Sequence, residues 1–235
     1  MSVRIAVVEH ESVCPPAHVG TWLGEAGATV DVVRPWAGDA LPAAAAYDGW
    51  VVLGGSMGAD DDALHHWLGP VKQLVRDCVA GGTPVLGICL GHQLIGSALG
   101  GTVEPNRLGQ QVGVYDVGWL PDAADDELVG ALGPVRGIQW NHDLVVVLPE
   151  GATALARTPQ GELQVARYGP RAWGVQLHPE ADEHVVASWT EGDREDHLER
   201  GVDQAALLDA VTQARAELDA AWRPLAQRFV ELCRA

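Results

Sequence analysis

A cysteine between two glycines, Cys89 in the stretch GICLG at residues 87–91, has the setting of a nucleophile. The apolar run 83–88 before it is typical of a strand, and residues 90–99 after it are typical of a helix. A sharp turn from strand to helix presents the side chain at its apex. The sulfur then lies at a helix N-terminus, whose N–H groups favour the thiolate, and the Leu90 N–H can point at an oxyanion. The other interpretation of such a residue is a packed, inert thiol.

The stretch VQLHPE at residues 175–180 carries the base and the orienting group that a thiolate nucleophile needs. His178 and Glu180 are two residues apart, so both face the same side of an extended segment. Glu180 can then hold the ring of His178 in one tautomer while the other ring nitrogen faces Cys89. Taken alone, a His-Pro-Glu sequence is more often a plain strand end.

A third stretch, GGSMG at residues 54–58, ends the strand-like run 47–55 in a glycine turn. Ligands of open α/β sheets bind at the edge where the strands have their carboxyl ends. A loop at that edge can offer another backbone N–H group to an oxyanion. Each stretch alone is a modest signal, but the three in this order and separation are hard to obtain by accident.

Together, GGSMG, GICLGHQ and VQLHPE resemble the class I glutamine amidotransferases, the triad-type glutaminases. The resemblance spans residues 3–189 and is strongest to stand-alone members related to the glutaminase domain of GMP synthase. It implies that Cys89 is the nucleophile and that His178 is the general base and acid. Glu180 is then the residue that orients His178.

The resemblance also implies which residues meet the substrate. Gly55 and Leu90 would supply the N–H groups of the oxyanion hole, and Gln93 would lie against the bound glutamine. We predict no cofactor and no metal ligand at this site.

Two departures from the family pattern are visible in the sequence. Ser56 stands where many members have a proline after the two glycines. In the stretch 139–143, QWNHD, Asn141 falls where the family's His-Gly-Asp segment usually has its histidine. That segment helps to bind the amino-acid end of the substrate, and we assign His142 no role in it.

The implied reaction is hydrolysis of the glutamine side-chain amide to glutamate and ammonia through a γ-glutamyl thioester on Cys89. One alternative keeps the same three residues and changes the substrate, because stand-alone members include γ-glutamyl peptidases, whose leaving group is an amine larger than ammonia. Another is a partner-gated or regulatory binding module. No synthetase domain follows residue 189, so we expect any acceptor of the ammonia to lie on a partner protein.

The elements that must position these residues alternate between strand and helix over the first hundred residues. We expect strands at 3–8, 29–34, 47–55 and 83–88 and helices at 16–27 and 63–80. This alternation predicts an α/β fold with a mostly parallel central sheet and flanking helices. The resemblance implies the flavodoxin-like class I glutaminase form of that fold.

Between residues 101 and 176 the pattern changes to short apolar or alternating runs divided by Gly, Pro and Asp. These runs predict a smaller antiparallel β region folded back onto the sheet. They are 103–104, 111–119, 135–140, 143–148, 152–157, 162–168 and 172–176.

The last part of the chain predicts helix. Residues 190–201 are highly charged and indicate a solvated connector, and an apolar stripe over 203–233 indicates a long helical stretch in which Pro224 begins a second helix or kinks one. We predict an amidotransferase-like domain at 1–189 and, at 190–235, the connector with a C-terminal helical extension packed on that domain. The stripe either covers this chain or forms a surface for a homodimer or another partner.

Composition limits the classes of function. The net charge of −17, from 32 acidic and 15 basic residues, repels phosphate and argues against nucleic-acid and membrane-surface binding. The resemblance implies a small-molecule substrate, which is glutamine or a γ-glutamyl compound. No apolar run is long enough for a transmembrane helix, and the N-terminal residues are unlike a signal peptide. The four cysteines are scattered, which indicates reduced thiols and a cytoplasmic location.

One acidic cluster could suggest a metal site. Asp60, Asp61 and Asp62 precede His65 and His66. We favour a structural interpretation, in which the aspartates stabilise the N-terminus of the helix expected at 63–80.

Overall fold

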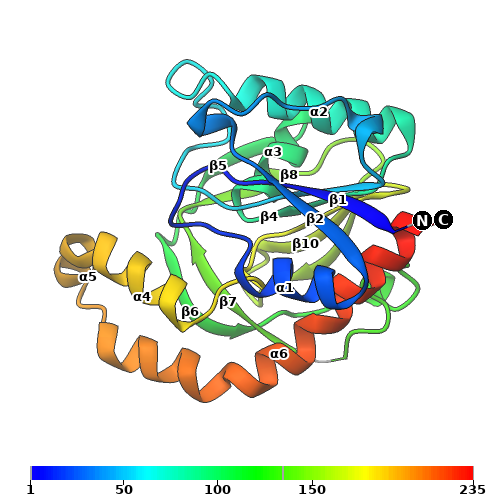
Figure 1. Ribbon diagram of the computed structural model, residues 1–235. Coiled ribbons are helices and arrows are strands. Elements are labelled where there is room, and N and C mark those ends of the chain that lie inside the picture. The colour runs from blue at the N-terminus through cyan, green and yellow to red at the C-terminus, as the bar shows by residue number, and fades with distance from the viewer. Residues whose placement is uncertain (1, 134, 235) are drawn as a thin grey trace.

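A seven-stranded sheet forms the centre of the computed structural model, which describes residues 2–133 and 135–234 (Figure 1). Its strand order is β2-β1-β3-β4-β11-β10-β9. The strands are β1 (Val3–Val8), β2 (Ala28–Val33), β3 (Gly49–Val52), β4 (Val85–Ile88), β9 (Thr153–Arg157), β10 (Leu163–Gly169) and β11 (Ala172–Val175). The five strands from β2 to β11 in this order pair in parallel. β10 pairs antiparallel with both of its neighbours, β11 and β9. The predicted α/β fold is therefore confirmed.

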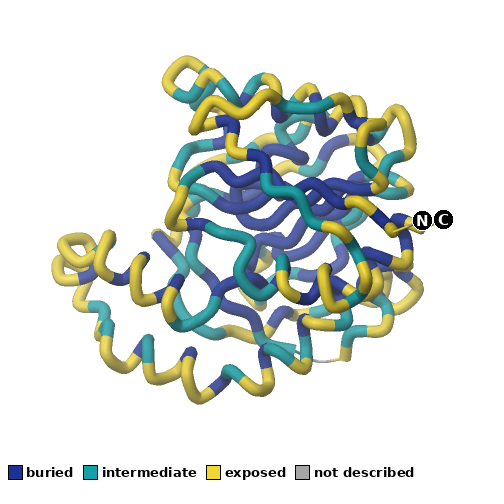
Figure 2. The backbone as a smooth tube through the Cα atoms, viewed as in Figure 1, coloured by how far each residue is buried: buried dark blue, intermediate teal, exposed yellow. Residues whose placement is uncertain are grey.

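Helices cover both faces of this sheet. They are α1 (Ala17–Glu25), α2 (Leu68–Gly81), α3 (Leu90–Ala98), α4 (Glu183–Gly192), α5 (Arg194–Arg200) and α6 (Gln204–Arg234), with short 3₁₀ turns at Pro35–Ala37, Ala44–Ala46 and Pro121–Ala123. Because side chains alternate along a strand, Val7 packs into the apolar cluster with α1 and α6, and Val8 into the one with α2 and α3. Figure 2 shows the buried strands between these two layers.

Three of the runs predicted for the antiparallel region belong to the central sheet instead. The runs 152–157, 162–168 and 172–176 became β9, β10 and β11. β11 is buried at all four residues, as a strand covered on both faces must be, and it pairs in parallel with β4. The remaining strands form two small antiparallel sheets, one of β5 (Thr102–Pro105) with β8 (Asp143–Val147) and one of β6 (Gln111–Asp116) with β7 (Arg136–Asn141).

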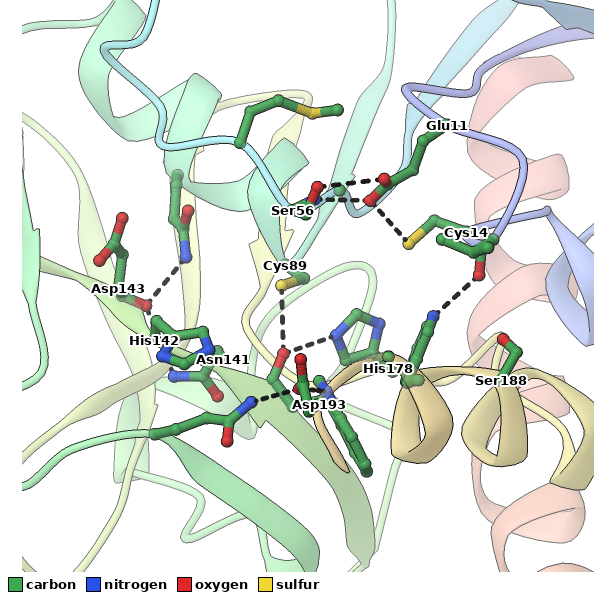
Figure 3. A pocket seen from close by; sticks show the side chains of 18 residues that line it. Glu11, Cys14, Ser56, Cys89, Asn141, His142, Asp143, His178, Ser188 and Asp193 are labelled. Atoms are coloured by element: carbon green, nitrogen blue, oxygen red, sulfur yellow. Dashed lines mark hydrogen bonds between the residues drawn. The ribbon is translucent and has the colours of Figure 1, made fainter. Parts of the chain in front are cut away.

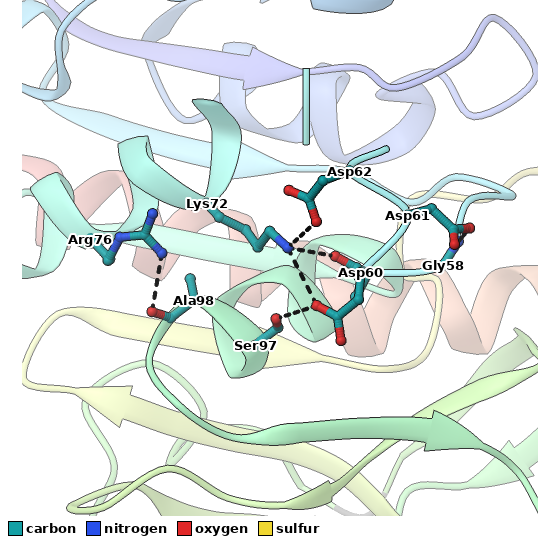
Figure 4. A network of polar contacts seen from close by, with 9 residues as sticks. Gly58, Asp60, Asp61, Asp62, Lys72, Arg76, Ser97 and Ala98 are labelled. Atoms are coloured by element: carbon teal, nitrogen blue, oxygen red, sulfur yellow. Dashed lines mark hydrogen bonds and ion pairs between the residues drawn. The ribbon is translucent and has the colours of Figure 1, made fainter. Parts of the chain in front are cut away.

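The helix expected at 63–80 begins only at Leu68, so the predicted role of the aspartates as its N-terminal residues is wrong. Asp60 and Asp62 instead bind the Lys72 ammonium, at 3.3 and 2.6 Å, and the Ser97 hydroxyl donates to Asp60 at 2.7 Å (Figure 4). These contacts fasten the segment after the GGSMG loop to α2 and α3. Within the described ranges, no group of three or more His, Cys, Asp or Glu side chains could hold a metal ion.

The predicted connector at 190–201 is helical, and apart from Thr190, Asp193 and His197 its residues are exposed, as expected of a solvated segment. It contains the end of α4 and all of α5, and His197 is fully buried. α6 then runs without a break, with Pro224 inside it. Its apolar residues share one buried cluster with β1 and α1, so the stripe covers this chain's own core. None of the helices that the structure describes has the length and apolarity to cross a membrane.

The register of the sheet determines where the predicted site forms. β3, β4 and β11 are parallel neighbours, with Val52 beside Gly87 and Ile88 beside Val175. The residues that follow them therefore meet at the carboxyl edge of the sheet. This places the GGSMG loop, Cys89 and the VQLHPE stretch close together although they are far apart in sequence.

Removing the largest buried side chain of α6 should test how much this helix contributes to stability. Trp222 is 1% exposed and donates its indole N–H to the Arg136 carbonyl at 2.8 Å. We expect Trp222→Ala to lower the free energy of unfolding by about 3–5 kcal/mol in urea denaturation, because it leaves a cavity and an unpaired carbonyl. Gln227→Ala, on the exposed side of the same helix, is the control and should change it by less than about 0.5 kcal/mol. Equal losses in the two variants would contradict this role of Trp222.

Candidate active site

The turn between β4 and α3 holds Cys89 in a backbone conformation that side chains rarely adopt. Its φ is 50° and its ψ is −108°, and its N–H donates to the Val175 carbonyl at 2.8 Å. Non-glycine residues in such conformations occur mainly where the surrounding structure enforces them, often at functional sites. The structure thus confirms the strand–turn–helix geometry at Cys89.

The flanking glycines are required by close packing of the backbone. A Cβ atom on Gly91 would overlap the Val52 carbonyl oxygen, and one on Gly87 would overlap the backbone of Gly91. α3 can therefore start directly against the end of β3 only if both residues lack side chains. The glycines serve the turn, and the turn presents the sulfur.

His178 and Glu180 form a buried pair beside this turn, and Figure 3 shows His178 next to Cys89 in the pocket. His178 Nδ1 lies 2.7 Å from Glu180 Oε1, and the two side chains are 3% and 1% exposed. His178 Nε2 lies 3.3 Å from the Trp140 carbonyl oxygen, and Cys89 Sγ lies 3.8 Å from the same oxygen. The thiol and the imidazole therefore meet at one carbonyl group.

Both ring nitrogens of His178 face groups that can only accept hydrogen bonds. A carboxylate and a backbone carbonyl are both acceptors, so this geometry suits a ring that carries a proton on each nitrogen. Burial lowers the pKa of His178, but the negative charges of Cys89 and Glu180 outweigh burial and raise that pKa well above 6.5. The site thus favours the imidazolium form of His178.

The GGSMG loop lies on the other side of Cys89. A Cβ on Gly54 would come within 3.1 Å of the His178 ring, and one on Gly55 would meet Leu90, Met57 and His10 at 3.0–3.1 Å. The loop backbone is thus pressed against the site. Leu90 begins α3, and the first N–H groups of a helix have no acceptor within it.

The carboxylate of Glu11, in the segment after β1, forms hydrogen bonds with this loop. Glu11 Oε1 accepts the Ser56 N–H at 2.6 Å, and Glu11 Oε2 lies 3.1 Å from the Ser56 hydroxyl. Only a residue other than proline at position 56 can donate this N–H. Glu11 therefore restrains the loop at the residue directly after Gly55.

A pocket of about 340 Å³ opens over these groups. Gly55, Cys89, Gln93 and His178 line it, whereas Glu180 and Leu90 lie behind its wall. The structure thus brings all six sequence-predicted residues to one place and exposes four of them to the pocket.

Gln93 is 4% exposed, and its side-chain NH₂ group donates to the Asp143 carbonyl at 2.9 Å. Asn141 and His142 also line the pocket. Asn141 is buried, its amide nitrogen lies 3.4 Å from both Gln111 Oε1 and the Asp143 carbonyl, and its Oδ1 has no partner among the described residues. An unpaired oxygen at the wall can accept a hydrogen bond from a ligand.

The sequence did not point to several residues of the pocket, among them Glu11, Trp140 and Asp193. Asp193, between α4 and α5, accepts the Trp140 indole N–H at 2.9 Å and the Gln110 amide at 2.8 Å. The charged run around it indicated a solvated connector, so no sequence signal pointed to the pocket. Trp140 acts through its backbone carbonyl, which is a group that every residue has.

The strain at Cys89 has a measurable consequence. At φ 50° a glycine is unstrained, so Cys89→Gly should be more stable than Cys89→Ala by about 1 kcal/mol in urea unfolding. The control is the same pair at Cys78 inside α2, where alanine should be the more stable residue by about 1 kcal/mol. If alanine were the more stable residue at position 89 as well as at position 78, the turn would not be strained.

The pKa of His178 should depend on the charge of its neighbour. Cys89→Ser replaces a side chain that can carry a negative charge by a neutral hydroxyl, so the imidazolium of His178 loses that stabilising charge and its pKa should fall below the wild-type value. In wild-type protein the imidazolium should persist to higher pH. NMR titration of the His178 ring, assigned by its loss in His178→Gln, measures both values. Equal pKa values in the two proteins would contradict the charge pairing.

Comparison with known proteins agrees with this geometry. The glutamine amidotransferase class-I family profile matches residues 20–186. The glutamine-hydrolyzing GMP synthase of Halobacterium salinarum has a subunit that is 36% identical over 156 residues, which are 66% of this chain and 76% of that protein. Gamma-glutamyl peptidase 5 of Arabidopsis thaliana is 29% identical over 191 residues, 79% of this chain and 74% of that one. A crystal structure of a glutamine amidotransferase from Thermotoga maritima superposes with a TM-score of 0.88 at 26% identity, covering 98% of this chain and 99% of that one. The chain therefore belongs to the class I glutamine amidotransferase family.

Proposed function

We propose that this protein hydrolyses the side-chain amide of glutamine to glutamate and ammonia through a thioester on Cys89. The observation that supports it best is the meeting of Cys89 and the His178–Glu180 pair at the Trp140 carbonyl. A nucleophile and a proton carrier thereby meet at the pocket, and a group that orients the carrier lies directly behind its wall.

In the first step the Cys89 thiolate attacks the amide carbon of the substrate. The carbonyl oxygen becomes an oxyanion, which the N–H groups of Gly55 and Leu90 stabilise. The imidazolium of His178 then gives its Nε2 proton to the departing nitrogen, and ammonia leaves while the γ-glutamyl thioester remains on Cys89.

In the second step His178, now neutral, takes a proton from water as the water oxygen attacks the thioester carbon. The Cys89–carbon bond breaks, glutamate leaves, and the thiolate and imidazolium are restored. Glu180 keeps the ring in position throughout through its 2.7 Å contact with Nδ1.

The charges of the pocket suit the amino group of the substrate. Glu11, Asp143 and Asp193 line the pocket, and none of the described residues around it is Lys or Arg. We infer that acidic side chains and the free Asn141 oxygen bind the ammonium of the substrate. Its carboxylate is then left to backbone N–H groups and neutral side chains.

A γ-glutamyl peptidase activity is the second candidate. The pocket extends past His178 to Val13, Ser188 and Trp189, from the segment after β1 and from α4. Because His178 delivers its proton to the leaving nitrogen, space beside it can hold a substituent on that nitrogen. The similarity to gamma-glutamyl peptidase 5 favours the same alternative.

If ammonia is the product, its acceptor is proposed to lie on a partner protein. This proposal follows the similarity to the Halobacterium salinarum protein, which is named as one part of a larger GMP synthase. A partner could also gate the site, in which case the isolated chain would hydrolyse glutamine slowly while Cys89 still reacted with a glutamine-like electrophile.

The activity can be tested with glutamine and a panel of γ-glutamyl amides of increasing size. We expect glutamate release from glutamine, a γ-glutamyl adduct on Cys89 in the mass spectrum of the acid-quenched enzyme, and loss of both in Cys89→Ala, at least about 10³-fold in kcat. Cys78→Ala removes a buried thiol of α2 and serves as the control with activity kept.

The panel decides between the two candidates. A higher kcat/KM for bulky amides than for glutamine would replace the glutaminase by a peptidase. Glutamate release by Cys89→Ala at the wild-type rate would exclude the thioester mechanism altogether.

A further inference from the structure

Two buried side-chain amides connect Cys89 to the backbone behind the pocket. Gln176 is fully buried, and its amide nitrogen lies 3.6 Å from Cys89 Sγ. Gln93 donates from its own amide nitrogen to Gln176 Oε1 at 3.3 Å and to the Asp143 carbonyl at 2.9 Å. The chain of contacts runs from the Asp143 carbonyl through both glutamines to the sulfur.

The backbone carbonyl determines which way each amide points. The Asp143 oxygen can only accept, so the group of Gln93 that faces it must be the NH₂ group. That NH₂ group also faces Gln176, which must therefore turn its oxygen toward Gln93. The NH₂ group of Gln176 is then directed at Cys89, and the opposite orientation would set two acceptors or two donors against each other.

We propose that Gln176 is a further catalytic residue, which donates an N–H hydrogen bond to the Cys89 sulfur and stabilises its thiolate, and that Gln93 is the positioning residue that fixes the Gln176 amide. A hydrogen bond to a charged acceptor is stronger than one to a neutral acceptor, so this contact favours the thiolate over the thiol. The arrangement gives the sulfur a donor on the Gln176 side in addition to the imidazolium.

Gln93, which is expected to lie against the bound glutamine, then has a second role in holding Gln176. Its NH₂ group is already engaged by Asp143 and Gln176, so Oε1 is the side-chain atom that it has left for a substrate. The side chain can thus contact glutamine and still hold Gln176 in place.

The proposal rests on the nucleophilic role of Cys89 in the proposed function, but it can be tested without any substrate. Alkylation by iodoacetamide measures the thiolate directly, because the thiolate is the attacking species. Its rate at Cys89, followed by peptide mass spectrometry, should be compared at pH 6 and at pH 10. A protein that does not hydrolyse glutamine would still give a clear answer.

For Gln176→Leu we expect alkylation of Cys89 at pH 6 to fall about tenfold relative to wild type, since one hydrogen bond to a charged group is lost. At pH 10, where thiols ionise without help, the rates should agree within about twofold. Gln176→Glu keeps the shape, replaces the donor by an acceptor and should lose at least as much at pH 6. It provides the answer should the leucine variant fail to fold.

A matched control is available in the neighbouring strand. Gln164 is also fully buried, and its backbone carbonyl accepts the Gln176 N–H at 2.8 Å, but its side chain contacts Gln139 rather than the sulfur. Gln164→Leu should keep the wild-type ratio of the rates at pH 6 and pH 10.

The positioning role of Gln93 predicts that the two glutamines do not act additively. Gln93→Leu frees the Gln176 amide to rotate, so alkylation at pH 6 should fall by less than in Gln176→Leu. The double variant should be no slower than Gln176→Leu alone. The proposal is overturned by wild-type alkylation of both Gln176 variants at pH 6, by an equal loss at pH 6 and pH 10, or by additive losses in the double variant.

Discussion

The close approach of α3 to the end of β3 is the constraint on which the site depends. Gly91 has no room for a side chain under the Val52 carbonyl, and its N–H donates to the Leu53 carbonyl at 3.0 Å. The same backbone continues directly into the GGSMG loop. One contact therefore determines both the turn that carries Cys89 and the start of the loop that faces it, so the two proposed oxyanion donors cannot move independently.

Much of this site was predictable because it follows from the pattern of the chain. Parallel strands have their carboxyl ends at one edge, so a cysteine after one strand and a histidine after its neighbour had to meet there. Residue alternation also placed His178 and Glu180 on one side. The same rule, applied two residues further back, puts Gln176 on that side too, and this signal was available in the sequence.

The predictions that were wrong have a common physical cause. A local sequence pattern does not reveal which distant residues a segment will contact. The sequence predicts β9, β10 and β11 as short strands. They belong to the central sheet because β11 pairs with β4, and β10 and β9 follow it in the strand order. A helix expected from residue 63 makes Asp60 and Asp62 look like its N-terminal residues, but α2 begins at Leu68 and its Lys72 binds both carboxylates. Asp193 belongs to a charged run, but it accepts hydrogen bonds from Trp140 and Gln110 and therefore lies at the pocket wall.

The hydrogen bonds between Glu11 and Ser56 have a consequence for which residues can occur together at these two positions in the family. Proline at position 56 would stiffen the loop through its ring and would leave Glu11 without an N–H to bind. Serine leaves the loop freer and lets a carboxylate restrain it instead. Positions 11 and 56 should therefore change together during evolution, an acidic residue at one accompanying a residue with an N–H at the other.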